Sequence, residues 1–239
     1  MPIYIKDGKS IHFVHIPKSA GTSIQQLFVD NNYSVYLFNK KNMFDFPCCP
    51  QHFHNELNDY LNILDCYYSF TIVRDPLSRI LSEYRFRGMP EKNISFDVFV
   101  RAAFMLYKLN KYCFDNHIRP QHEFISDGIK VYKYEDGVNS ILLSLEAKGI
   151  VKIPEIIPHK YKSKSEQLCL TSDTLKRVYD FYDKDYNLFN YDKNTKSAFV
   201  DIDDPYYSFT GLKAVLLCAK IHFMTTVKSI IKKYSFLRK

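Results

Sequence analysis

Short apolar runs alternate with amphipathic stretches along this chain. We predict a strand at each of four runs that favour extended structure: 11–16, 34–38, 69–73 and 131–134. Apolar residues at helical spacing predict helices in the stretches between and after them: 22–28, 51–64, 76–84, 96–109, 136–147 and 172–188. This alternation predicts an α/β fold of three layers, with a mainly parallel sheet flanked by helices.

The turn after the first strand has the composition of an anion-binding site. Pro17 ends the strand pairing because it has no N–H to donate, and the small residues at 19–21 let the backbone approach a ligand. We expect Thr22 or Ser23 to cap the next helix. Free N–H groups and the helix dipole converge at a helix start, and Lys18 adds a positive charge, so a phosphate-like anion should bind here.

This turn differs from the phosphate loop of ATP- and GTP-binding proteins, G-x-x-x-x-G-K-[ST]. Lys18 precedes Gly21, and the turn has no second glycine upstream. A second anion site is expected after the 69–73 strand. Arg74 leaves that strand at the ligand edge of the sheet, Asp75 and Pro76 begin a helix, and Ser82 follows about two helical turns later. An arginine fork suits phosphate because it donates two parallel hydrogen bonds.

The composition of the chain limits the kinds of ligand and partner that it is expected to bind. The chain of 239 residues carries a net charge of +7, which favours an anionic ligand or surface, but no recognisable motif supports binding to nucleic acid. The six cysteines form no Cys-x-x-Cys pair, so we expect reduced thiols and a cytoplasmic protein. The N-terminus does not have the pattern of a signal peptide. Cysteine and histidine cluster at 48–54 without a zinc spacing, and we predict no metal.

Several segments together resemble the sulfotransferases that use 3′-phosphoadenosine 5′-phosphosulfate, and HIPKSAGTSI resembles the glycan O-sulfotransferases in particular. PKSAGTS resembles their 5′-phosphosulfate loop, and TIVRDPLSRILSEY resembles their 3′-phosphate motif. RPQHEFI, KVYKYED and the tyrosine pattern near 179–191 extend the resemblance over roughly residues 10–192. It implies a sulfotransferase fold related to the phosphate-loop proteins. Golgi members carry an N-terminal anchor, so the lack of one in this sequence is expected of a bacterial or viral-like member or of a shortened chain.

The resemblance implies roles for individual residues. Lys18 would stabilise the leaving phosphate, and His52 would be the catalytic base, with His54 an open alternative and Glu56 the next candidate. The residues implied to bind the donor are Lys18, Ser19, Ala20, Gly21, Thr22, Ser23, Arg74 and Ser82. Lys162, Ser163 and Lys164 lie where related enzymes have a loop over the cofactor, although a solvated basic loop would have the same composition.

The function that the resemblance implies is transfer of a sulfuryl group from this donor to a carbohydrate hydroxyl, on a glycan or glycolipid acceptor. Protein tyrosine, a lipid hydroxyl and a small metabolite stay open as acceptors. Two alternatives stay open. A nucleotide-dependent kinase would use a similar loop, although the displaced lysine and the lack of a clear magnesium-binding carboxylate count against it. A nucleotide-binding module without catalytic activity would keep the same anion sites.

The end of the chain lies outside the resemblance. We expect a sulfotransferase domain over 1–192, a polar linker over 193–210 and a basic amphipathic helix over 211–239. The apolar stripe of that helix comprises Leu212, Val215, Leu216, Ala219, Phe223, Val227, Ile230, Ile231 and Tyr234. It would pack on the domain or on a second subunit, or lie in an anionic membrane surface at the inner face of the membrane. The oligomeric state stays open.

Overall fold

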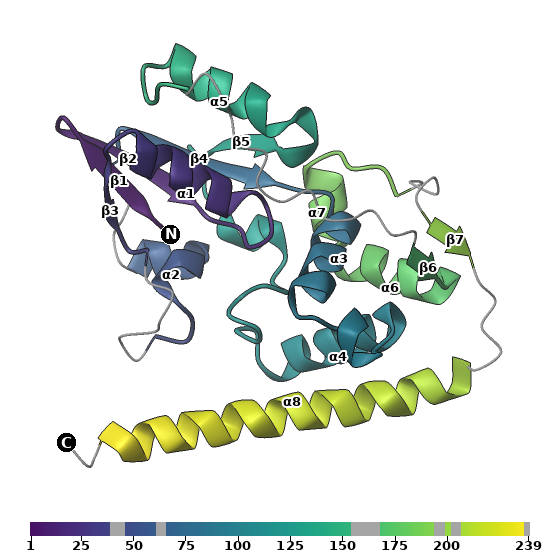
Figure 1. The fold of residues 1–239 in the computed structure, drawn as a ribbon. Coiled ribbons are helices and arrows are strands. Elements are labelled where there is room, and N and C mark those ends of the chain that lie inside the picture. Colours follow the sequence, from purple (N-terminus) through teal and green to yellow (C-terminus); the bar gives the residue numbers. More distant parts are fainter. Residues whose placement is uncertain (39–45, 61–65, 154–167, 194–198, 202–206, 237–239) are drawn as a thin grey trace.

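The computed structural model describes the chain except for residues 39–45, 61–65, 154–167, 194–198, 202–206 and 237–239 (Figure 1). Its centre is a five-stranded sheet whose strands run in the order β3-β1-β2-β4-β5. The strand bounds are β1 Ile3–Lys6, β2 Lys9–Val14, β3 Ser34–Tyr36, β4 Tyr68–Val73 and β5 Lys130–Lys133. All four strands expected from the sequence lie in this sheet, and the α/β class of fold is confirmed.

The sheet is parallel in only two of its four pairings, which corrects the expectation of a mainly parallel sheet. β2 pairs with β4 and β4 with β5 in parallel, whereas β1 pairs antiparallel with both β2 and β3. A hairpin creates this antiparallel part. Asp7 and Gly8 connect β1 to β2 with φ of 49° and 74°. A type I′ hairpin turn requires positive φ at both positions, and Asp-Gly is a preferred pair for it.

The parallel half of the sheet positions the candidate site. β2 and β4 are neighbours and run in the same direction, so the segments after Val14 and Val73 leave the sheet at the same edge. Ligands of open α/β sheets bind beyond this edge. Lys18 and Arg74 lie in these two segments, as the sequence predicts.

Helices cover both faces of the sheet. Their bounds are α1 Gly21–Asp30, α2 Asn55–Tyr60 and α5 Val138–Ala147, with 3-10 helices η1 Pro50–His52, η3 Gln121–Phe124 and η4 Tyr134–Asp136. α1 and α5 share one apolar cluster with Phe13 and Phe70 of the sheet. On the other face, Phe53 and Phe124 pack with Val14. The site therefore lies at the end of a sheet that is held from both sides.

A group of helices packs beside the sheet (Figure 1). Their bounds are α3 Pro76–Phe86, η2 Pro90–Lys92, α4 Phe96–Leu109, α6 Ser172–Phe181 and α7 Asp183–Leu188. The predicted cap of α3 is confirmed, because the Asp75 side chain accepts a hydrogen bond from the N–H of Ser78. The helix expected over 172–188 is divided at Tyr182, whose side chain is buried and donates a hydrogen bond to the carbonyl of Ile118.

The C-terminal helix α8 spans Tyr207–Phe236 and lies along α4 (Figure 1). It begins four residues before the expected 211, and the expected linker contains β7 Phe199–Asp201, which pairs with β6 Leu168–Leu170. Ala214 and Cys218 face α4, so the face that packs is not the stripe expected from the sequence. Within the described residues, no helix combines the length and apolar character that crossing a membrane requires.

Candidate active site

One pocket of about 1700 Å³ brings most of the predicted site residues together at this edge of the sheet. The predicted residues that line it are Lys18, Ala20, Gly21, Thr22, Ser23, His52, Arg74 and Ser82. Ser19 lies in the same loop but is buried beneath it. Lys162, Ser163 and Lys164 fall outside the described residues, so the covering loop stays a prediction.

The loop from Lys18 to Gly21 is tightly curved. Lys18 and Ala20 have φ of 69° and 62°, a left-handed conformation that non-glycine residues seldom adopt. Ala20 is the N-cap of α1 and makes no side-chain capping bond, which corrects the predicted cap at Thr22 or Ser23. Both of those side chains are exposed in the first turn of the helix. The start of α1 consequently has backbone N–H groups, and no capping side chain, to offer to an anion.

Lys18 is half-buried at the mouth of this loop. Its Nζ lies 4.0 Å from the ring centroid of Phe86 in α3. Burial lowers the pKa of the Lys18 ammonium, and the nearby Glu83 carboxylate opposes that shift. The charge of Lys18 is thus held in a fixed place by an aromatic face, beside the α1 terminus.

Gly21 is required by a close contact beneath the loop. A Cβ at this position would lie 1.8 Å from Nε2 of His15, so a side chain cannot be added without displacing that ring. The His15 ring in turn meets the ring of His52 edge to face, with centroids 5.1 Å apart. Because Gly21 has no side chain, the loop from Lys18 to Gly21 can pack directly on His15, whose ring contacts His52.

Arg74 is fixed through its backbone. Its N–H donates to the side chain of Gln121 at 2.9 Å, and its carbonyl accepts from the same side chain at 2.7 Å. Gln121 is held by the fully buried Asp185, which accepts its backbone N–H at 2.7 Å. Gln121 of the RPQHEFI segment and Asp185, which lies within the 179–191 pattern, therefore position the arginine together.

The Arg74 guanidinium reaches across to the first loop. It donates to the carbonyl of Lys18 at 3.2 Å and lies over the ring of Tyr134. Its Nε is buried with no partner among the described residues, and the buried hydroxyl of Ser19 also has none. The unpaired Arg74 Nε leaves room for an acceptor atom of an anionic ligand, because a buried donor is costly when unsatisfied, whereas Ser19 lies beneath the loop and does not line the pocket.

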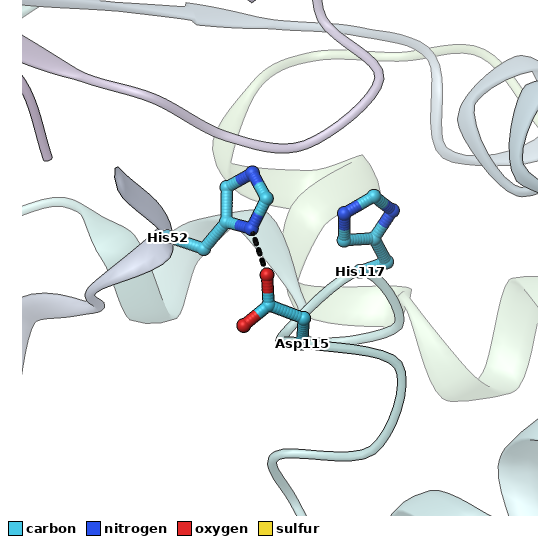
Figure 2. A group of neighbouring side chains, drawn as sticks. All are labelled: His52, Asp115 and His117. Atoms are coloured by element: carbon cyan, nitrogen blue, oxygen red, sulfur yellow. Dashed lines mark hydrogen bonds and ion pairs between the residues drawn. The ribbon is translucent and has the colours of Figure 1, made fainter. Parts of the chain in front are cut away.

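His52 pairs with a carboxylate that the sequence did not single out. Its Nδ1 lies 2.7 Å from Oδ2 of Asp115 (Figure 2). Burial lowers the pKa of His52 to about 4, against the raising effect of Asp115. Burial would raise the pKa of Asp115, but its bond to His52 and the backbone N–H of Cys49 lower it. At neutral pH the pair is therefore a neutral imidazole and a carboxylate, and Nδ1–H donates to Asp115.

A strained segment presents Asp115. Phe114, Asp115 and Asn116 have φ of 55°, 60° and 65°, three consecutive left-handed residues. Such residues normally occur singly and cost about 1–3 kcal/mol each. Asn116 holds the segment in place, because its side chain donates to the carbonyl of His52 at 2.9 Å. The side chains of Asp115 and Asn116 thus contact both the ring and the main chain of His52.

A second histidine–carboxylate pair faces the first. Nδ1 of His117 lies 2.7 Å from Oε2 of Glu83, a buried residue of α3 that also pairs with Arg87. Burial would raise the pKa of Glu83, yet His117 and Arg87 lower it to about 2. Figure 2 shows the His117 ring turned toward His52, and their centroids are 4.8 Å apart.

The two histidines and Asp115 also form the one group in the described part of the chain whose ligand atoms could hold a metal ion. The Nδ1 atom of His52 already bonds directly to Asp115, and the same carboxylate accepts the N–H of Cys49 at 2.6 Å. These bonds account for the arrangement without an ion. The expectation of no metal stays a prediction.

His54 lies differently. Its side chain is 1% exposed, contacts the ring of Tyr112 and has Nε2 3.3 Å from the exposed Glu56. Neither His54 nor Glu56 is among the residues that line the pocket. Of the three candidate bases, His52 alone lies in the pocket.

Sequence reasoning missed His15, Glu83, Asp115 and His117. The last two lie in a segment with no hydrophobic periodicity, whose left-handed backbone no residue pattern reveals. Glu83 could have been noticed as a charged residue on the buried side of α3, one position before Tyr84 of the predicted apolar face. His15 lies just before the anion-binding turn, so its place in the sequence made it the easiest of the four to identify as a site residue.

The profile of the Sulfotransferase family matches residues 1–192 of this chain. The match covers most of the chain and both histidine–carboxylate pairs, and the chain belongs to this family. Sulfuryl transfer is therefore its general activity, and the chain is a transferase. Searches of curated proteins and of solved structures returned no match.

Proposed function

We propose that this sulfotransferase moves a sulfuryl group from 3′-phosphoadenosine 5′-phosphosulfate to a carbohydrate hydroxyl, with His52 as the base. The observation that carries the proposal is the His52–Asp115 pair, which lies in the same pocket as the Lys18 loop and Arg74. Sulfuryl transfer needs a base for the acceptor hydroxyl and positive charge for the leaving phosphate, and this pocket holds both.

The residues of the pocket fit the donor. Lys18, the buried Ser19 hydroxyl and the start of α1 would hold the 5′-phosphosulfate, and Arg74 and Ser82 would hold the 3′-phosphate. The unpaired Arg74 Nε, from a residue that lines the pocket, supports this assignment. When bound, the donor supplies the sulfuryl group, and its phosphate oxygen leaves with the electron pair as the acceptor oxygen bonds to sulfur.

The proton of the acceptor hydroxyl would pass to His52. Because Nδ1–H donates to Asp115, Nε2 of the neutral ring carries the lone pair that accepts this proton. The Asp115 carboxylate then stabilises the imidazolium that forms, as the carboxylate does in a Ser-His-Asp triad. Lys18 contributes its fixed positive charge where negative charge grows on the leaving group.

The acceptor class rests on the motif alone. HIPKSAGTSI is the segment that resembles glycan O-sulfotransferases, and we propose a glycan or glycolipid acceptor on that ground.

Calorimetry and a turnover assay test the proposal together. We expect tight binding of 3′-phosphoadenosine 5′-phosphate and much weaker binding of ATP. We also expect labelled sulfuryl to pass from the donor to at least one member of a glycan panel. Preference for ATP would support a kinase instead, whereas nucleotide binding without turnover on any acceptor would support a binding module.

A further inference from the structure

The C-terminal helix α8 has one packed face and one open apolar face. Ala214 and Cys218 are buried against α4. On the opposite side, Leu212, Leu216 and Phe223 are 60%, 61% and 69% exposed. Figure 1 shows α8 at the edge of the molecule, with α4 on one side and no described element beyond it.

These exposed side chains form one continuous surface. Positions 212, 216, 219 and 223 are four, three and four residues apart, the spacing that keeps side chains on one helix face. We call this surface the outer stripe, and its described members are Leu212, Val215, Leu216, Ala219 and Phe223. In the sequence, Val227, Ile230 and Tyr234 continue the same spacing to the end of the helix.

The net positive charge of the protein comes from the same segment of the sequence. Every charged residue after Asp204 is basic: Lys213, Lys220, Lys228, Lys232, Lys233, Arg238 and Lys239. These residues equal the net charge of +7, so residues 1–206 are neutral as a whole. Lys213 and Lys220 are exposed and follow outer-stripe residues along the helix.

We propose that the outer stripe docks this protein on an anionic membrane surface, with α8 lying parallel to the bilayer. An apolar face inserts at the boundary between headgroups and acyl chains, and flanking lysines meet lipid phosphates. The alternative of a second copy on the same face is disfavoured by charge. Two α8 helices would bring lysines together with no acidic residue to pair them.

The position of α8 gives this docking a consequence for the pocket. Ile221 and His222 of the same helix line the pocket on its inner side. A membrane bound to the outer stripe would therefore hold the pocket beside the bilayer.

Vesicle sedimentation of the full chain tests the proposal. We expect binding to vesicles of phosphatidylcholine with phosphatidylserine, weaker binding to phosphatidylcholine alone, and loss of the difference at high salt. Leu216→Ser with Phe223→Ser should lower the partition coefficient at least tenfold, and so should Lys213→Glu with Lys220→Glu. The matched control is Leu143→Ser with Leu188→Ser, whose side chains are 60% and 62% exposed on other helices and should leave binding unchanged.

Light scattering and melting curves make each result decisive. All four substituted positions of the test variants are exposed, so melting temperatures should match the wild type. No binding to the phosphatidylserine vesicles, or an equal loss in the control variant, would overturn the proposal. A dimer that Leu216→Ser with Phe223→Ser dissociates, in a protein that binds no vesicles, would assign the stripe to a second copy instead.

Discussion

Replacing His52 by alanine should abolish transfer and leave nucleotide binding intact. A positioned general base contributes about 10²–10⁴-fold to a rate, so we expect kcat to fall by that factor. The donor is expected to contact Lys18 and Arg74, and the affinity for 3′-phosphoadenosine 5′-phosphate should therefore stay within about threefold of the wild type. His54→Ala is the matched control, because that histidine lies outside the pocket.

The role of His52 as the base also predicts how kcat/KM changes with pH. Burial holds the pKa of His52 near 4, so its neutral form persists as the pH falls from 7 to 5. Between these pH values, kcat/KM should change less than about twofold. A histidine with the ordinary pKa of about 6.5 would be only about 3% neutral at pH 5 and would lose more than tenfold. Asp115→Asn removes a cause that raises this pKa, so the acid limb should move lower while kcat falls.

The assay follows labelled sulfuryl transfer to the best acceptor of the glycan panel at each pH. Melting curves over the same range show whether the protein stays folded. A profile that falls more than tenfold between pH 7 and 5 in folded protein would refute the buried neutral base. A larger loss in His54→Ala than in His52→Ala would move the base to His54.

Four further predictions address the rest of the molecule. Lys18→Ala should lower kcat by about 10²–10³ with only a moderate loss of nucleotide affinity, and near-normal turnover would contradict its role. Arg74→Ala should weaken nucleotide binding about ten- to hundredfold, and calorimetry should show no such loss for a nucleotide without the 3′-phosphate. Gly21→Ala should lower kcat because its Cβ would displace the ring of His15, which packs against the ring of His52. Unchanged kinetics would exclude that contact. Ala214→Glu should lower the melting temperature by several degrees, whereas Ala219→Glu on the exposed side should not.

The sequence was sufficient for the parts of the fold that repeat a periodic pattern. Strong periodicity defined the helix over 96–109 at both ends, and the order of motifs brought Lys18 and Arg74 to one sheet edge. Periodicity could not decide which face of α8 packs. The larger apolar side chains formed the more visible stripe, but the smaller Ala214 and Cys218 allow the helix to approach α4 closely. The pair Asp7-Gly8 is typical of a hairpin turn and could have predicted the antiparallel strands. The alternation of strands and helices favoured a parallel sheet instead.

The candidate site could be predicted only where it is local in the sequence. The loop at 18–23 and the arginine turn are contiguous motifs, so residue order was enough to find them. The partner of His52 lies 63 residues away on an irregular segment, and nothing in its composition indicates a carboxylate aimed at a base. Arg79, which lies within TIVRDPLSRILSEY, is buried and donates to the carbonyls of His117 and Arg119. Its contacts therefore give it a structural role.

Backbone strain supports this pocket as the functional site independently of any motif. In the described part of the chain, ten non-glycine residues have positive φ. Six of them are Asp or Asn, which tolerate this conformation more readily: Asp7, Asn32, Asn93, Asp115, Asn116 and Asn190. Of the other four, Lys18, Ala20 and Phe114 line the pocket, and Leu37 does not. Conformations that cost about 1–3 kcal/mol each persist only where surrounding structure enforces them. Here they shape the loop from Lys18 to Gly21 and the segment that presents the Asp115 carboxylate to His52.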